Sequence, residues 1–212
     1  MRSFEGLEPK SMYEAGGVAV TGLLAYLDYR RRVWKRRYEN AAQESKLDPK
    51  TGLLTYPAFT DEVIRRTEST QRSQDVRRIH GLVFADIDDF GLLNQALTHP
   101  VTDEKALLPV AEVLTRAVRP DTDLVARFGG EEFVIFLSDV DPMQVGNVCR
   151  RIQNEVNSIR PDANSLASIG VTVAHTVFGQ GDSYKEVFQK LSAGVVEAKE
   201  VPNKNQIVAI GY

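Results

Sequence analysis

Apolar and polar residues alternate in blocks along most of the chain, and these blocks predict both strands and helices. Leu82–Ile87 is a compact apolar run of the kind found in a buried central strand. Asp123–Phe128 and Phe133–Leu137 contain several β-branched and aromatic residues and flank a Gly-Gly pair, so they predict a hairpin. Ala167–Ala174 and Gln206–Ile210 predict two further strands.

Between these strands, apolar residues recur at helical spacing. The clearest stripe predicts one face of a helix and consists of Val145, Val148, Cys149, Ile152, Val156 and Ile159. Other helices are predicted at Phe59–Thr67, Phe90–Ala96, Ala106–Val118 and Val187–Ala198. The predicted order is therefore strand, two helices, hairpin, helix, strand, helix and strand, after the short first helix. This order favours an α+β fold with a mostly antiparallel central sheet covered by helices.

The first 46 residues differ from the rest and predict an N-terminal helical stalk. No proline occurs between residues 12 and 45, and apolar residues approximate a 3.5-residue repeat that Arg31 interrupts. A dimerising coiled coil and a helix packed on its own domain both fit this pattern. Leu47–Gly52 is rich in helix breakers, so we place the boundary there, with a second domain over residues 47–212.

The N-terminal region also contains an apolar run that raises the question of contact with a membrane. Its longest apolar run, Ala15–Leu27, has thirteen residues, whereas a membrane-spanning helix needs roughly 20. A basic cluster, Arg30–Arg37, follows this run. Contact of the helix with a membrane surface is therefore an alternative that we do not favour.

Composition narrows the class of protein. Hydrophobic residues make up 42% of the chain and charged residues 26%, as in ordinary globular domains. The net charge of −3 argues against a nucleic-acid-binding surface. Cys149 is the single cysteine and lies in a predicted apolar helix face, which predicts a core position and is typical of a reducing, cytoplasmic compartment.

Four acidic residues form the main candidate chemistry. Asp86 and Asp88 end the predicted central strand and share one of its faces, because side chains two apart point the same way. Glu131 and Glu132 follow the Gly-Gly turn. A hairpin does not require paired acids, whereas Mg²⁺ binds carboxylates together with phosphate oxygens and water. The alternative is that Asp88 and Asp89 cap the following helix.

Five motifs in order make the chain resemble the GGDEF domains of diguanylate cyclases from about Asp48 onward. The family motifs are D-x-L-T-G-L, D-x-D-x-F-K-x-x-N, G-G-[DE]-E-F, S-I-G and a terminal A-K. The matching segments here are Asp48–Leu53, Asp86–Asn94, Gly129–Phe133, Ala167–Val171 and Ala198–Lys199.

The resemblance implies a ferredoxin-like, nucleotidyl-cyclase-like palm core. It implies condensation of two GTP molecules into cyclic di-GMP with release of pyrophosphate, one GTP being held by each subunit of a homodimer. It further implies Mg²⁺, with Mn²⁺ as an alternative, bound by Asp86, the carbonyl of Ile87 and Glu131. The resemblance also implies that Glu131 lies near the attacking hydroxyl and that Glu132 supports the metal site. It implies a contact between Lys199 and the substrate. The guanine site that it implies consists of Asn94, His99 and Asp103.

The chain also departs from the family pattern. The lysine after D-x-D-x-F is Gly91, and both glycines of Y-G-H-x-x-G-D are threonines, Thr98 and Thr102. The G-R-N that follows A-K is replaced by Pro202–Lys204, which removes an arginine and leaves Lys204 as a candidate substitute. The retained acids favour an active enzyme. The alternative is a degenerate domain that binds nucleotide or dimerises as a regulatory module without turnover.

Overall fold

The structure, a computed structural model, describes residues 46–71, 78–97, 99–161, 168–179, 181–200 and 204–211. The predicted stalk and its coiled coil lie outside these residues, apart from residue 46, so they stay predictions. Within the described ranges, no helix is both long and apolar enough to cross a membrane.

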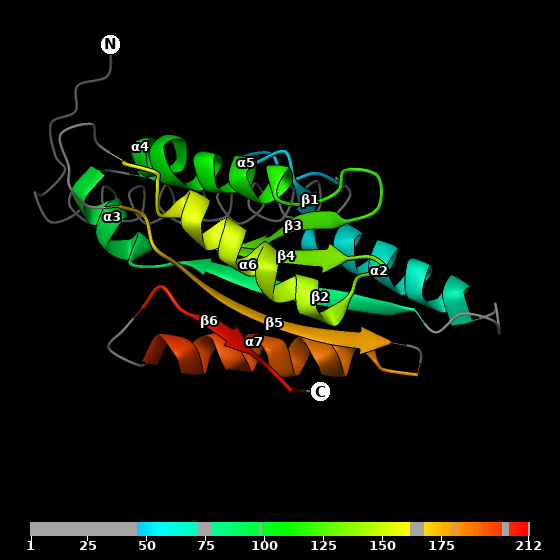
Figure 1. The fold of residues 1–212 in the computed structure, drawn as a ribbon. Helices are drawn as coiled ribbons and strands as arrows, with labels where there is room; N and C mark the ends of the chain where they lie inside the picture. Colours follow the sequence, from blue (N-terminus) through cyan, green and yellow to red (C-terminus); the bar gives the residue numbers. More distant parts are fainter. Residues whose placement is uncertain are drawn as a thin grey trace, which may run out of the picture. The chain divides into compact units, whose positions relative to one another are not determined.

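A six-stranded sheet, with strand order β1-β3-β4-β2-β5-β6, forms the centre of the fold (Figure 1). Its strands are β1 (Leu54–Thr55), β2 (Ile79–Ile87), β3 (Leu124–Gly129), β4 (Glu132–Leu137), β5 (Val171–Gly179) and β6 (Ile207–Ala209). The central strand β2 pairs antiparallel with β4 and β5, and β3 pairs antiparallel with β4. Only the outer pairs, β1–β3 and β5–β6, are parallel among the described strands. The predicted α+β fold with a mostly antiparallel sheet is confirmed.

Helices cover both faces of this sheet. They are α2 (Tyr56–Gln71), α3 (Phe90–Leu97), α4 (His99–Thr102), a π-helical turn η1 (Asp103–Leu107), α5 (Leu108–Arg116), α6 (Pro142–Val156) and α7 (Tyr184–Glu200). The apolar faces of α5 and α6 enter one core cluster, and those of α2 and α7 enter the other.

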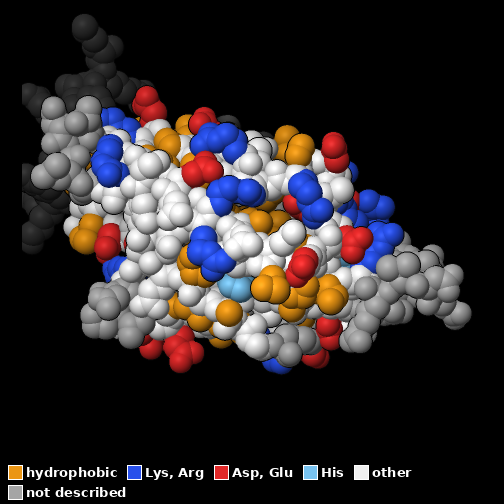
Figure 2. Space-filling model, in the orientation of Figure 1, with side chains coloured by type: hydrophobic (Ala, Val, Ile, Leu, Met, Phe, Trp, Pro, Cys, Tyr) orange, Lys and Arg blue, Asp and Glu red, His pale blue; other side chains and the backbone are white. Residues whose placement is uncertain are grey.

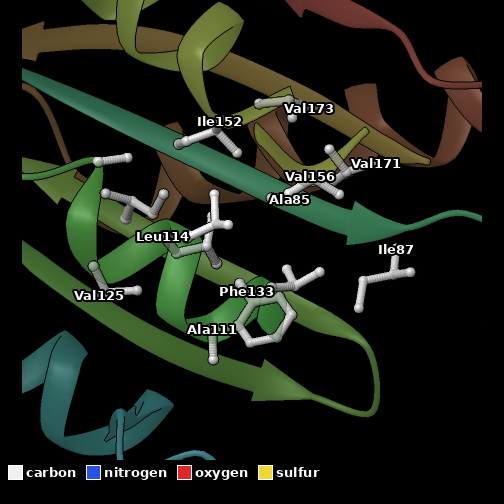
Figure 3. Close-up of a cluster of buried hydrophobic side chains, with 14 of the residues drawn as sticks. Ala85, Ile87, Ala111, Leu114, Val125, Phe133, Ile152, Val156, Val171 and Val173 are labelled. Carbon is white, nitrogen blue, oxygen red and sulfur yellow. The ribbon is translucent and has the colours of Figure 1, made fainter. Parts of the chain in front are cut away.

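The two-residue period of a strand divides the sheet residues between these two clusters. In β2, Val83, Ala85 and Ile87 belong to the cluster under α5 and α6, whereas Leu82 and Phe84 belong to the cluster under α2 and α7. The strand β4 alternates in the same way, and Figure 3 shows its Phe133 in the first cluster. The positions that share a face with Phe84 therefore point toward α7.

Several predicted boundaries were wrong, for identifiable reasons. The strand predicted at Ala167–Ala174 runs from Val171 to Gly179, because β5 pairs with β2 along its whole length, ending at Ile79↔Gly179. The apolar pattern did not predict this extension, because His175 and Thr176 are polar and interrupt the apolar run. The first helix begins at Tyr56, before the predicted Phe59, with Pro57 in its first turn, where proline is tolerated.

Cys149 occupies the core position that its helical stripe predicted. Its side chain is fully buried in α6, and burial raises the pKa of the thiol to about 12. A thiol with so high a pKa is almost entirely protonated at neutral pH and is a poor nucleophile.

An ion pair within the loop between α5 and β3 joins Arg119 to Asp123. The guanidinium of Arg119 donates to both oxygens of Asp123, at 3.1 Å from Nε and 2.8 Å from Nη2. Two backbone N–H groups, those of Arg119 and Ser138, also donate to this carboxylate. Figure 2 shows basic side chains on this surface of α5 and α6, where Arg116, Arg119 and Arg151 line a hollow of about 500 Å³.

Asp123→Asn is expected to destabilise the fold in a pH-dependent way. Burial raises the pKa of Asp123, but the hydrogen bonds from Arg119 and Ser138 outweigh it and leave the pKa below its ordinary value. The carboxylate therefore stabilises the fold fully above its unfolded pKa of about 3.9 and loses this effect as the pH falls through the folded pKa. The free energy of unfolding should drop by about 1.5–3 kcal/mol at pH 7.

Urea unfolding of both proteins at several pH values checks this expectation. The difference between Asp123→Asn and the unsubstituted chain should shrink below about pH 4. If the difference in the free energy of unfolding stayed constant between pH 7 and pH 3, it would contradict a stabilising role of the ionised Asp123 carboxylate. Asp121→Asn, at an exposed position two residues away, is the matched control.

Candidate active site

The Gly-Gly segment forms the hairpin turn that the sequence predicts. The strand β3 ends at Gly129, β4 begins at Glu132, and Gly130 has φ of +50°, a left-handed conformation that glycine adopts without a Cβ clash. The guanidinium of Arg127 donates to the carbonyl of Gly130, at 3.0 Å from Nε and 2.6 Å from Nη2. The turn that carries Glu131 is therefore held by a side chain from the preceding strand.

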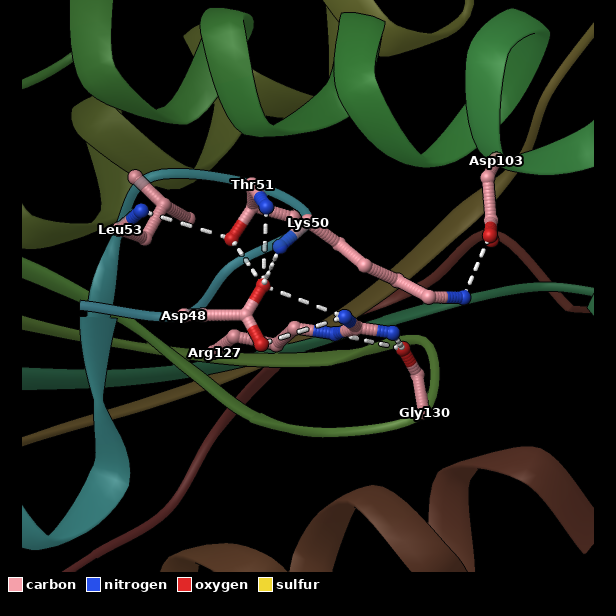
Figure 4. A network of polar contacts seen from close by, with 7 residues as sticks. All are labelled: Asp48, Lys50, Thr51, Leu53, Asp103, Arg127 and Gly130. Atoms are coloured by element: carbon pink, nitrogen blue, oxygen red, sulfur yellow. Dashed lines mark hydrogen bonds and ion pairs between the residues drawn. The ribbon is translucent and has the colours of Figure 1, made fainter. Parts of the chain in front are cut away.

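The loop Asp48–Leu53 holds Arg127 in place (Figure 4). Asp48 accepts hydrogen bonds from Nη1 of Arg127 at 3.2 Å and from the hydroxyl of Thr51 at 2.8 Å. Burial raises the pKa of Asp48, but the Thr51 hydrogen bonds and the Arg127 charge lower it below its ordinary value. Sequence reasoning assigned no role to Asp48 or Arg127, although an Asp three residues before a Thr is a signal for a side-chain-stabilised turn.

The acids of β2 and β4 meet on the face of the sheet that α7 covers. Asp86 is the direct cross-strand neighbour of Glu132, and the N–H of Ile87 donates to the carbonyl of Glu131 at 3.3 Å. Lys199 of α7 donates to Oδ1 of Asp86. The structure thus brings together Asp86, Glu131 and Glu132, as the sequence predicted, and adds Lys199, which no local pattern placed there. The chemical roles of these residues stay predictions.

Burial, with neighbouring like charge added to it, raises the pKa of Asp86 and of Glu132. For Asp86 the largest cause is burial, which outweighs the hydrogen bond from Lys199, and the neighbouring Glu131 and Asp88 add to it. For Glu132 burial again comes first, followed by the charges of Asp86 and Glu131. Like charges directly opposite each other destabilise a sheet. Packing alone does not account for this arrangement, but a bound cation would relieve the repulsion.

Asp88 does not join this group in the same way. Its buried carboxylate accepts hydrogen bonds from the hydroxyl of Thr172 and from the N–H of Asn205, each at 2.8 Å. The alternative interpretation, a cap of the next helix, does not describe the Asp88 side chain either. The carbonyl of Asp89 accepts the first bonds of α3, and the Asp89 carboxylate pairs with Lys204. Asp88 links β2 to β5 and to the segment before β6.

The residues expected to contact the base lie on the helices that follow β2. The hydroxyl of Thr102 donates to the carbonyl of Leu93 at 3.3 Å, which brings the turns carrying Asn94 and Asp103 together. The amide oxygen Oδ1 of Asn94 is buried and has no hydrogen-bond partner among the described residues, an unusual state that a ligand donor would resolve. His99 is exposed on α4, and Asp103 pairs with Lys50.

The candidate metal-binding residues would suffice for an ion shared with a substrate but not for a closed protein site. In the described ranges no three His, Cys, Asp or Glu side chains gather into a complete site. Asp86, Glu131 and the Ile87 carbonyl supply two carboxylates and one carbonyl at adjoining backbone positions. This donor set fits Mg²⁺, which takes one or two carboxylates and completes its shell with phosphate oxygens and water.

Comparisons with known proteins agree with this geometry. A family model described as "Diguanylate cyclase, GGDEF domain" matches residues 45–205. The "Probable diguanylate cyclase DgcT" of Escherichia coli is 29% identical over 76% of this chain and 35% of its own length. The "Probable diguanylate cyclase DgcJ" of the same organism is 26% identical over 76% of this chain and 31% of its own length. The chain thus spans about a third of these curated relatives.

A solved structure shares the fold as well. The GGDEF domain of DgcB from Caulobacter crescentus, crystallised in complex with c-di-GMP, is 27% identical, with a TM-score of 0.69 over 78% of this chain and 95% of that one. The family model covers most of the chain, and the five motifs lie in the family order. The chain therefore belongs to the GGDEF domain family of diguanylate cyclases.

Proposed function

We propose that the protein is a diguanylate cyclase that condenses two GTP molecules into cyclic di-GMP. The 3′-hydroxyl of each GTP attacks the α-phosphate of the other, so two new phosphodiester bonds form and two pyrophosphates leave. The observation that carries this proposal is the placement of Asp86 opposite Glu132, beside Glu131 and under Lys199. Such like-charged neighbours at the end of a central strand fit a site for a metal and phosphates.

The residues would divide the work as follows. Asp86, Glu131 and the Ile87 carbonyl would hold Mg²⁺, which offsets negative charge on the reacting phosphate. Glu131 would also lie near the attacking hydroxyl, and Glu132 would support the site from the next position. Lys199 binds Asp86 in this structure and is a candidate phosphate contact. Asn94 and Asp103 would bind the base.

Turnover requires two such sites facing each other, so we propose a homodimer. Incubation of the purified protein with GTP and Mg²⁺, followed by chromatography of the products, tests the proposal. Light scattering on the same sample reports the oligomeric state, and chelation of the metal should stop the reaction. A dimeric sample that forms no cyclic dinucleotide from GTP, alone or mixed with ATP, would overturn the proposal.

A regulatory module without turnover is the second candidate function. Gly91, in place of the family lysine, removes one cationic group near the phosphates and favours this alternative. Such a module would bind nucleotide or dimerise but would form no product.

Gly91→Lys is expected to strengthen GTP binding by about tenfold or more, because a hydrogen bond to a charged group contributes about 1.5–3 kcal/mol. A side chain has room at this position: a Cβ added to Gly91 meets no atom within 4 Å. Calorimetric titration with 3′-deoxy-GTP, which lacks the attacking hydroxyl, measures the affinity. Gly91→Gln has a similar reach without the charge and is the control. Equal affinities for the two variants would contradict a phosphate contact at this position.

A further inference from the structure

An ammonium group lies among the acids at the end of the central strand. Lys199, in the last turn of α7, donates to Oδ1 of Asp86. Asp86 is a donor of the candidate metal site and lies opposite Glu132, while the carbonyl of Glu131 accepts a hydrogen bond from the next residue of β2. Lys199 therefore supplies part of the positive charge that this group of carboxylates requires.

The helix that carries Lys199 is fixed against the sheet, whereas the side chain itself has freedom to move. Val195 of α7 is buried, and Gly194 is packed so closely that an added Cβ would lie 2.4 Å from Cδ1 of Ile210. The Lys199 side chain is 25% exposed, against 11% for Asp86. A lysine side chain has a long, flexible stem. The ammonium group can therefore leave Asp86 by rotation of the side chain, without movement of α7.

The contact between Lys199 and Asp86 opposes the binding of a second cation through its charge. The carboxylate keeps lone pairs for a metal, so Lys199 does not block its oxygens. The positive charge of the ammonium group, however, repels any other cation on the same carboxylate. Between a single and a double positive charge a few ångströms apart, this repulsion is large enough to lower the affinity about tenfold, even in water.

Nucleotide phosphates would change this balance. Mg²⁺ completes its shell with phosphate oxygens, so phosphates bound to an ion on Asp86 would lie beside the residue that Lys199 contacts. Phosphate oxygens are strong acceptors for an ammonium group. Their negative charge also allows two cations to remain close together. With Lys199 paired to phosphate, the charge of Asp86 would be available to the metal.

We propose that Lys199 makes the binding of the divalent cation conditional on the nucleotide. In the nucleotide-free protein it neutralises Asp86 and weakens metal binding there, and it releases Asp86 when phosphates bind. This inference rests on the proposed function, because it requires a metal on Asp86 and a nucleotide beside it. Lys199 is then more than a phosphate contact: it couples the two ligands, so that the ion and the nucleotide bind together.

Titration of Mn²⁺ into the nucleotide-free protein tests the first half of the proposal without any turnover. The electron paramagnetic resonance signal of free Mn²⁺ weakens as the ion binds, so it reports the dissociation constant. Lys199→Met should bind Mn²⁺ about tenfold more tightly than the unsubstituted protein, because the repelling charge is gone. Lys199→Arg, which retains a cation, should keep the low affinity.

Two controls assign the gain to this site. Lys185→Met removes an exposed lysine from the first turn of the same helix, and its affinity for Mn²⁺ should be unchanged. Glu131→Gln, introduced into Lys199→Met, removes a proposed metal donor and should abolish the gain. Thermal melting of each variant checks that it is folded.

Calorimetric titration with 3′-deoxy-GTP, with and without Mn²⁺, tests the second half. Coupling between two ligands is reciprocal, so the factor by which the metal strengthens nucleotide binding equals the factor by which the nucleotide strengthens metal binding. This factor should be about tenfold larger in the unsubstituted protein than in Lys199→Met.

Equal Mn²⁺ affinities of Lys199→Met and the unsubstituted protein, a gain that survives Glu131→Gln, or equal coupling factors would each overturn this inference. The proposed function would then stand or fall by its product assay. If no folded variant binds Mn²⁺ at all, with or without 3′-deoxy-GTP, the proposed metal site fails and this inference fails with it.

Discussion

Replacing Glu131 by glutamine is expected to lower the rate of cyclic di-GMP formation by about 10²–10³-fold, because a catalytic metal contributes several kcal/mol to the transition state. Glutamine preserves the size of the side chain and removes only its charge. The backbone contact at this position, from the Ile87 N–H to the Glu131 carbonyl, does not depend on the side chain. The substitution therefore tests the role of the Glu131 charge and leaves the backbone of the turn unchanged.

We expect Glu131→Gln to lose activity without losing thermal stability. Burial first, and then the Glu131 and Asp88 charges, raise the pKa of Asp86 against the opposing effect of Lys199. The charge of Glu131 therefore adds to the repulsion among the acids, and removing it should leave the melting temperature unchanged or slightly higher. Glu131→Gln that is folded but inactive would separate a catalytic role from a structural one.

Product chromatography and thermal melting of the same preparations measure both effects. Glu197→Gln is the control, since it makes the same chemical change at an exposed position of α7, two residues from Lys199. It should retain full activity. Undiminished cyclic di-GMP formation by Glu131→Gln would contradict the proposed metal site. A protein whose cellular output survives the substitution without any turnover would fit the regulatory module instead.

Phe133→Ala is expected to reduce the free energy of unfolding by about 3–5 kcal/mol, the usual cost of truncating a buried phenylalanine. Phe133 is fully buried, and Figure 3 shows its ring among the aliphatic side chains of the cluster under α5 and α6. Its strand neighbour is Glu132, whose partner across the sheet is Asp86. The last residue of the G-G-E-E-F motif is therefore a core residue that supports the acids.

Thermal and urea unfolding measure this effect, and the melting temperature should fall by about 6–20 °C. Phe128→Ala is the matched control from the same hairpin. Its ring lies on the opposite face, is 37% exposed and packs against Tyr56 with ring centroids 4.7 Å apart. Phe128→Ala should reduce the free energy of unfolding by less than Phe133→Ala does. Equal losses from the two substitutions would show that the hairpin is not divided between two cores as described.

The sequence predicted the order and type of most elements because strand and helix periods are local properties. The apolar run Leu82–Ile87 predicted a central strand. The Gly-Gly pair predicted the hairpin, because glycine can adopt the backbone conformations that a tight turn needs. Boundaries were less predictable. The strand β5 continues past Ala174 because β2 offers it a full-length partner, and the short strand β1 exists because it can pair with β3.

The candidate site was predictable in its composition and less so in its contacts. The motif order identified Asp86, Glu131, Asn94 and Asp103 from their positions alone. Asp88 shared the strand period with Asp86, yet its carboxylate binds Thr172 and Asn205, which lie 84 and 117 positions away. No local pattern distinguishes these two aspartates, because their difference arises from segments that meet only after folding.

By itself, the sequence determined the family, the α+β class and the set of acids at the hairpin, since these depend on residue types, spacing and period. The tertiary structure alone decided that Asp86 faces Glu132 and meets Lys199, which lies 113 positions away. It also decided that Lys50 binds Asp103 and that Arg127 links the Asp48 loop to the turn. The reason is physical: charged side chains interact over a few ångströms in space, and only the packing of distant segments sets those distances.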